Sequence, residues 1–204
     1  MRKRIIIIKV IGILLAALAT SFIGHNNSRA EDLQWSTIGS GGILDEASTS
    51  KNKFYGGVVA FRGSNTGTLE LRYPIPKPAN VDALDFDPLC NMTARIRDDG
   101  RYANVKIFLE EYDIFTGTTN TVWEMDSDWV PASPDFQTIG VCMDGFFACK
   151  VMDFSNKLYY LRVMIKRTNY TAKAEFGGIM FNAPTCVQDV EYITRLPTSQ
   201  CLCP

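Results

Sequence analysis

The middle of the chain alternates apolar and polar residues with a period of two, which is the pattern of β-strands that bury one face. This alternation predicts strands over residues 69–73, 90–97, 103–110 and 158–167, with further strands near 54–61, 120–125, 136–143 and 175–181. The residues expected to face the core from the longest segments are Leu69, Leu71, Tyr73, Cys90, Met92, Ala94, Ile96, Ala103, Val105, Ile107, Leu109, Tyr159, Leu161, Val163 and Ile165.

Turn residues separate several of these segments. Asp98-Asp99-Gly100 lies between 90–97 and 103–110 and predicts a hairpin. Thr116-Gly117-Thr118 predicts a second hairpin, between the strand that ends near Tyr112 and the strand over 120–125. The pairs Gly56-Gly57 and Gly177-Gly178 lie inside predicted strands, where paired glycines indicate a bulge or a close approach of two backbones.

After residue 30, no stretch keeps apolar residues at helical spacing over three turns. Short strands at near-regular intervals with Gly, Asp and Asn turns predict an all-β fold, a two-sheet antiparallel β-sandwich that is jelly-roll-like. We expect a flexible N-terminal segment over 31–53, the sandwich over 54–186 and a cysteine-containing tail over 187–204.

The first thirty residues have the features of a secretory signal peptide. Three basic residues follow Met1, an apolar stretch interrupted by Lys9 comes next, and Ser28-Arg29-Ala30 offers small residues for a signal peptidase. An uncleaved membrane anchor is the alternative, and a cut after Ala19 is another. Cleavage after Ala30 predicts a secreted, periplasmic or cell-surface protein without stable membrane insertion, and removes the histidine of the chain, His25.

Charge excludes one class of partner. Five of the 21 Lys and Arg lie in the leader, which has no acid, so 16 basic residues remain against 22 Asp and Glu, a net charge of −6. An acidic domain without a basic stripe lacks the phosphate-neutralising surface of nucleic-acid-binding proteins. Without histidine, imidazole-dependent catalysis and imidazole metal ligands are also excluded from the mature chain.

Six cysteines in an exported chain favour disulfides. Cys142 and Cys149 bracket a turn-like segment and could staple a hairpin. A bridge between Cys201 and Cys203 would be strained, so these two are expected to reach Cys90 and Cys186, although the sequence leaves the pairing open. A metal or redox site in the tail is the functional alternative, but its thiolates are closer together than zinc sites usually space them.

The segment Glu124-Met125-Asp126-Ser127-Asp128 places acids two residues apart, on one face of a strand. It resembles the Glu-x-Asp-x-Glu strand motif of the laminarinase-like glycosidases, with Asp128 where that motif has its last glutamate. The resemblance implies a carboxylate glycosidase that uses Glu124 with Asp126 or Asp128. The favoured interpretation is that Asp126-Ser127-Asp128 turns the chain out of a strand, because aspartate and serine are common turn residues.

Acidic residues also raise the question of a metal. Asp82, Asp85 and Asp87, with Asp98 and Asp99 elsewhere, could supply oxygen ligands to a structural calcium ion. They do not match the helix-loop-helix calcium pattern, and solvated turn residues need no ion. We therefore predict no cofactor beyond this possible calcium.

Aromatic side chains favour a binding function, because flat rings on a sandwich surface can stack on sugars. The candidates are Trp35, Tyr73, Tyr112, Trp123, Trp129 and Tyr160, each of which could instead belong to the core. Trp123 and Trp129 flank the acidic turn, and with Asp126 they form the predicted ligand site.

Three functions remain open. The first is an exported, non-catalytic β-sandwich that binds a glycan or a surface protein. The second is the carboxylate glycosidase, and the third is a structural or assembly component of a cell envelope, with contacts through sheet edges or the tail.

Overall fold

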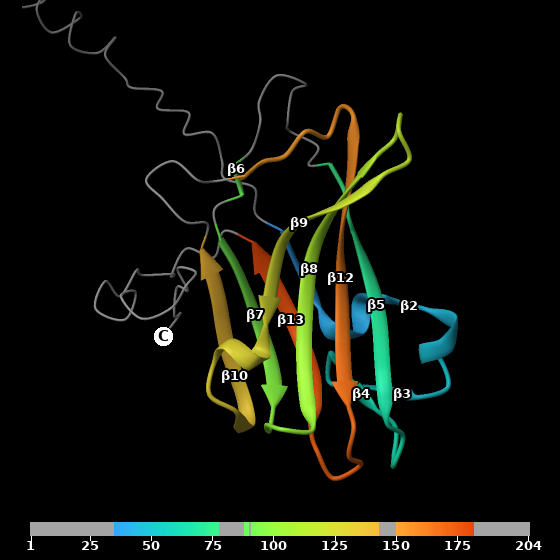
Figure 1. Cartoon of the computed structure of the whole chain (residues 1–204), viewed down its shortest axis with the longest axis vertical. Helices are drawn as coiled ribbons and strands as arrows, with labels where there is room; N and C mark the ends of the chain where they lie inside the picture. The colour runs from blue at the N-terminus through green and yellow to red at the C-terminus, as the bar shows by residue number, and fades with distance from the viewer. Residues whose placement is uncertain (1–34, 78–87, 90, 143–149, 182–204) are drawn as a thin grey trace, which may run out of the picture. The chain divides into compact units, whose positions relative to one another are not determined.

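The computed structural model describes residues 35–77, 88–89, 91–142 and 150–181, with only the backbone given for Pro88, Cys142 and Val151. They form two main antiparallel sheets (Figure 1). The six-stranded sheet runs in the order β10 (Ser133–Cys142), β7 (Asn91–Asp98), β13 (Ala174–Phe181), β4 (Val58–Phe61) and β3 (Asn52–Tyr55), and β1 (Trp35–Ile38) also pairs with β13.

The second sheet has five strands in the order β2 (Ile43–Leu44), β5 (Gly67–Ile75), β12 (Lys157–Arg167), β8 (Ala103–Asp113) and β9 (Thr119–Asp126). A small third sheet pairs β6 (Pro88–Leu89) with β11 (Lys150–Val151). Three short 3-10 helices, η1 (Gly39–Gly41), η2 (Glu46–Ser48) and η3 (Ser127–Trp129), connect strands in the described residues. The predicted two-sheet antiparallel sandwich is confirmed, and its jelly-roll topology stays a prediction.

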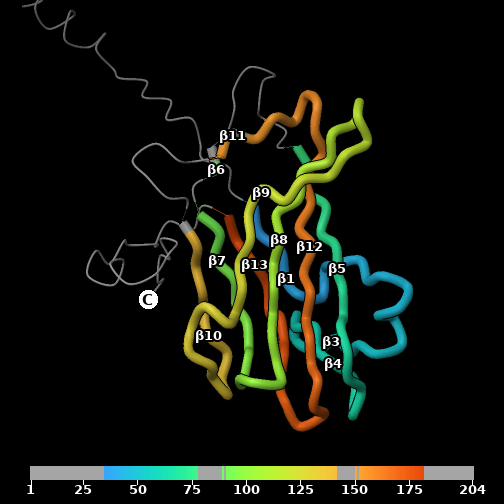
Figure 2. The backbone as a smooth tube through the Cα atoms, in the orientation of Figure 1, coloured from blue at the N-terminus to red at the C-terminus, as the bar shows by residue number. Residues whose placement is uncertain are grey.

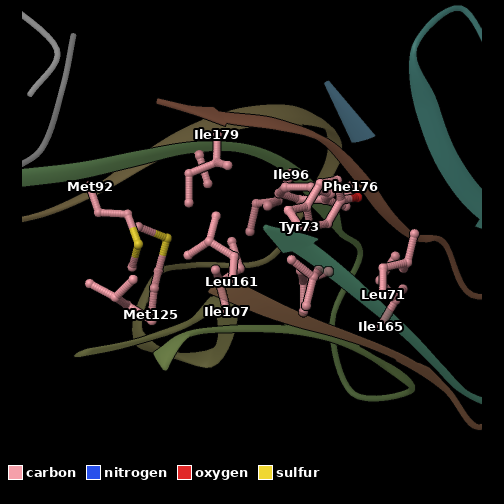
Figure 3. Packing of buried hydrophobic residues seen from close by; sticks show 14 of the residues in the cluster. Leu71, Tyr73, Met92, Ile96, Ile107, Met125, Leu161, Ile165, Phe176 and Ile179 are labelled. Carbon is pink, nitrogen blue, oxygen red and sulfur yellow. The ribbon is translucent and has the colours of Figure 1, made fainter. Parts of the chain in front are cut away.

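The two main sheets enclose one apolar core. Met92 and Ile179 of the six-stranded sheet face Met125 and Leu161 of the five-stranded sheet (Figure 3). The Tyr73 ring packs edge-on against Phe176 across the core, with 5.8 Å between ring centroids. The predicted inward residues within the described part of the chain are buried, which confirms the strand faces inferred from the alternation.

The tyrosine hydroxyl in this core has a structural partner. Tyr73 Oη donates a hydrogen bond of 2.5 Å to the Gly39 carbonyl of η1. Burial raises the pKa of Tyr73, because the phenolate would lose its hydration. Tyr73 is therefore a core residue that ties η1 to the five-stranded sheet.

The predicted hairpin at Asp98-Asp99-Gly100 is wrong. The chain leaves β7 in one sheet and enters β8 in the other (Figure 2). The buried Asp98 carboxylate accepts hydrogen bonds from Gly100 N, at 2.9 Å, and from the Ser127 hydroxyl, which orders this crossing. Alternation identifies the buried face of each strand, but two strands on opposite sheets present the same pattern to the shared core.

The other turn predictions have mixed outcomes. The Thr116-Gly117-Thr118 hairpin is confirmed, since β8 pairs with β9. Gly177-Gly178 forms the predicted bulge, and a Cβ at Gly178 would lie 2.6 Å from the Thr37 carbonyl oxygen. Gly56-Gly57 is a two-residue turn between β3 and β4, because both glycines have positive φ, so the single strand predicted over 54–61 is wrong.

The remaining predictions concern the N-terminal segment, the leader, the cysteines and the calcium ligands, and the structure describes only some of these residues. Strands β1 and β2 and the first half of β3 lie within the segment 31–53, and β1 and β2 pair with β13 and β5. The leader, Asp82, Asp85 and Asp87, and every cysteine except the backbone of Cys142 lie outside the described residues, so the disulfides and the calcium ion stay predictions. The part of the chain that the structure describes contains no helix with the length and apolar content of a membrane span.

Candidate functional site

The outer face of the five-stranded sheet carries charged, polar and aromatic side chains. Even-numbered positions of β5, β12, β8 and β9 point outward because the odd-numbered positions fill the core. We call this surface the five-stranded face; its central residues are Glu70, Arg72, Lys106, Phe108, Glu110, Glu124, Asp126, Tyr160, Arg162 and Met164.

Arg162 lies at the centre of this face and is held on several sides. Its Nε and Nη2 atoms donate to Glu110 Oε1 at 3.0 and 2.7 Å. Nη1 donates to the Met164 sulfur at 3.0 Å, and the guanidinium carbon lies 4.3 Å from the Phe108 ring centroid. Paired hydrogen bonds and the stacked ring fix the orientation of this cation.

Two aromatic residues flank this arginine. Phe108 lies opposite Arg162 in the register between β8 and β12, and Tyr160 lies opposite Pro74 and Glu110. Both rings are half-buried. No hydrogen bond to the Tyr160 hydroxyl occurs among the described residues, so this group can bond a ligand. The face therefore combines rings for stacking with fixed donors and acceptors.

The acidic segment predicted from the sequence forms the β9 side of this face. Lys106 Nζ lies 2.5 Å from Asp126 Oδ2 and 3.6 Å from Glu124 Oε1. The hydrogen bond to Asp126 is the main cause that raises the pKa of Lys106, and Glu124 adds to it. The two carboxylates share one ammonium group.

Asp126 has further structural partners. Its Oδ1 accepts a hydrogen bond of 2.7 Å from Asn104 Nδ2 and one of 3.1 Å from Asp128 N. The second bond caps η3, which leaves the end of β9. The prediction that Asp126-Ser127-Asp128 turns the chain out of a strand is confirmed.

The structure separates the two tryptophans of the predicted ligand site. Trp123 is 8% exposed and belongs to the core cluster, which favours the core interpretation of this residue, and its ligand role stays a prediction. Trp129, at the end of η3, is 36% exposed. Trp123 shares its parity with Met125 and alternates with Glu124, and this signal in the sequence already points inward.

The remaining aromatic candidates divide between core and surface. Tyr73 is in the core and Trp35 packs against it, with its ring 5.1 Å from that of Phe181. Tyr112 and Tyr160 are half-buried at outward positions. The sequence reasoning missed Phe108 and Arg162, although Phe108 carries a signal as an aromatic residue between the polar positions Lys106 and Glu110 of β8.

Comparisons with known proteins yield no family. No family model matches the sequence, and no curated protein matches it. Solved structures with a similar arrangement include a xylan-binding module, at 14% identity and a TM-score of 0.40, covering 74% of this chain and 98% of that one. A family 11 carbohydrate-binding module from Clostridium thermocellum, in complex with a β-1,3-1,4-mixed-linked tetrasaccharide, is 15% identical, with a TM-score of 0.35 over 74% of this chain and 90% of that one.

A third similar structure is a family two carbohydrate esterase from Cellvibrio japonicus, at 8% identity and a TM-score of 0.35. That alignment covers 73% of this chain but only 33% of the esterase. These likenesses are loose similarities in strand arrangement, and no ligand or activity follows from them.

Proposed function

We propose that this chain is an exported, non-catalytic β-sandwich protein that binds carbohydrate on the five-stranded face. The observation that carries the proposal is the fixed Arg162–Glu110 pair between the Phe108 and Tyr160 rings. Sugars present apolar ring faces and many hydroxyls, and this surface offers aromatic area beside oriented donors and acceptors. Export is supported by the leader at residues 1–30.

Preorganisation supports binding on this face. Glu110 is buried, and its second oxygen, Oε2, accepts a hydrogen bond of 3.2 Å from the Thr121 hydroxyl. Because these side chains are already ordered, a ligand would not have to immobilise them.

The contacts of the acids oppose the glycosidase alternative. A retaining enzyme needs one carboxylate free to attack and another that delivers a proton. Here Glu124 and Asp126 share Lys106, and Asp126 also bonds Asn104 and the backbone of η3. Release of reducing ends that disappears in Glu124→Gln would establish the enzyme instead.

The direct test is binding of the purified full chain to neutral polysaccharides, measured by affinity electrophoresis and calorimetry. Tyr160→Ala should weaken binding about tenfold, the effect of losing one stacked ring. Tyr102→Ala is the matched control, because Tyr102 is 44% exposed but lies at the end of the β7–β8 turn. No binding to any polysaccharide, or equal losses in both variants, would overturn the proposal.

A further inference from the structure

The outer face of the six-stranded sheet carries more cations than anions. Its outward positions include Lys53 on β3, Arg95 and Arg97 on β7, and Glu175 on β13. We call this surface the six-stranded face. Its positive balance is unusual here, because the chain after residue 30 has more Asp and Glu than Lys and Arg.

The two arginines share an aromatic support. The guanidinium carbons of Arg95 and Arg97 lie 5.8 and 4.6 Å from the centroid of the Phe136 ring on β10. Arg95 Nη1 also donates to the Thr138 hydroxyl at 3.1 Å. The ring and the hydrogen bond orient the Arg95 guanidinium before a ligand binds, which lowers the entropy cost of pairing with an anion.

Glu175, the one anion among these four residues, already has partners within the face. Glu175 Oε2 lies 3.0 Å from Arg97 Nη1 and accepts a 2.7 Å hydrogen bond from the Tyr55 hydroxyl. Its side chain is 10% exposed, so it is largely withdrawn from solvent. No carboxylate of the described residues lies within ion-pairing distance of Arg95 or Lys53, so these two exposed cations are available to a ligand.

The cations of this face lie on two strands separated by β13 and β4, since Arg95 and Arg97 are on β7 and Lys53 is on β3. Arg97, Glu175, Ala60 and Lys53 follow one another across neighbouring strands. With about 4.8 Å between strands, the row spans about 14 Å. Cations at both ends of such a row fit an extended polyanion better than one small ion.

We propose that the six-stranded face binds an acidic polysaccharide, one that carries carboxylate or sulfate groups, through Arg95, Arg97 and Lys53. Planar arginine groups pair with carboxylates and sulfates through two parallel hydrogen bonds, and Phe136 and Tyr55 add apolar area beside them. This inference rests on the proposed carbohydrate binding and adds a second surface with its own ligand chemistry.

The test compares three polymers on the full chain: a polyuronate, a sulfated galactan and a neutral xylan. The double variant Arg95→Gln/Lys53→Gln should lose at least about tenfold in affinity for an acidic polymer, since hydrogen bonds to charged groups are removed. It should leave xylan binding unchanged. Loss confined to the polyuronate or to the sulfated polymer identifies which anion is recognised.

Lys77→Gln/Lys166→Gln is the matched control, because both are exposed lysines, one just after β5 and one on β12 of the other sheet, without an ion pair among the described residues. This control also removes two positive charges and should keep its affinity for the acidic polymers. Equal losses in the control would show non-specific attraction and overturn the inference. If the chain binds xylan but neither acidic polymer, this inference is overturned and the proposed carbohydrate binding still stands. If the chain binds none of the three polymers, both the inference and the proposed function are overturned.

Discussion

The two outer faces of the sandwich arise from the same alternation, yet they differ in how their charges are arranged. On the five-stranded face, Arg162 pairs with Glu110, Arg72 with Glu70, and Lys106 with two acids. On the six-stranded face, Glu175 pairs with Arg97, and Arg95 and Lys53 have no carboxylate partner among the described residues. A face whose charges pair internally suits a neutral ligand with many hydroxyls, whereas a face with unpaired cations suits an anionic one.

The largest change in stability should come from substituting a core residue of β9, compared with its neighbour on the five-stranded face. Trp123→Ala removes a core side chain and should lower the free energy of unfolding by about 3–5 kcal/mol. The neighbouring Glu124→Ala changes an outward position, 41% exposed, and should alter it by less than about 0.5 kcal/mol. Urea denaturation measures both. Similar small changes would mean that Trp123 belongs to the surface.

The next effect tests whether ion pairing stabilises one face more than the other. Glu110→Gln removes the charged partner of Arg162 within a largely buried pair and should reduce stability by about 1–3 kcal/mol. Arg95→Gln on the six-stranded face should reduce it by less than about 0.5 kcal/mol, since Arg95 is exposed and lacks a carboxylate partner among the described residues. Thermal unfolding of the two variants under the same conditions checks this. Equal losses of stability in the two variants would show that ion pairing does not stabilise the five-stranded face more than the six-stranded face.

The smallest effect concerns the hydrogen bond within the six-stranded face. Burial, with the hydrogen bond to Glu175, raises the pKa of Tyr55 to about 12. The folded protein therefore keeps a proton that the unfolded chain loses near pH 10, so stability falls as pH rises from about 10 to about 12.

Tyr55→Phe should remove this part of the pH dependence. Denaturation at a series of alkaline pH values, with ultraviolet titration of the phenolates, measures it. An unchanged slope in the variant would contradict the Tyr55–Glu175 bond.

Several features of the fold could be predicted from sequence because they depend on nearby residues. The turn after Asp113 follows from its own side chain, which accepts hydrogen bonds of 2.9 Å from Phe115 N and Thr116 N. The bulge lies at the glycine pair that predicts it, since the register between β13 and β7 shifts between Phe176 and Gly178. Such signals lie within a few residues of the structure that they specify.

The candidate site was predicted only in part. Asp126 does lie on the five-stranded face, but as a structural partner of Lys106 and Asn104. Phe108 and Arg162 were not foreseen, because their contact depends on the pairing of β8 with β12, strands separated by β9, β10 and β11 along the chain.

The sequence by itself determined where most strands run and which of their residues are buried. Both properties follow from a period of two within one short segment. Only the tertiary structure decided that β7 and β8 belong to different sheets, and which outward side chains become neighbours. Strand pairing joins residues that are distant in the chain, and a local pattern contains no information about the partner across the sheet.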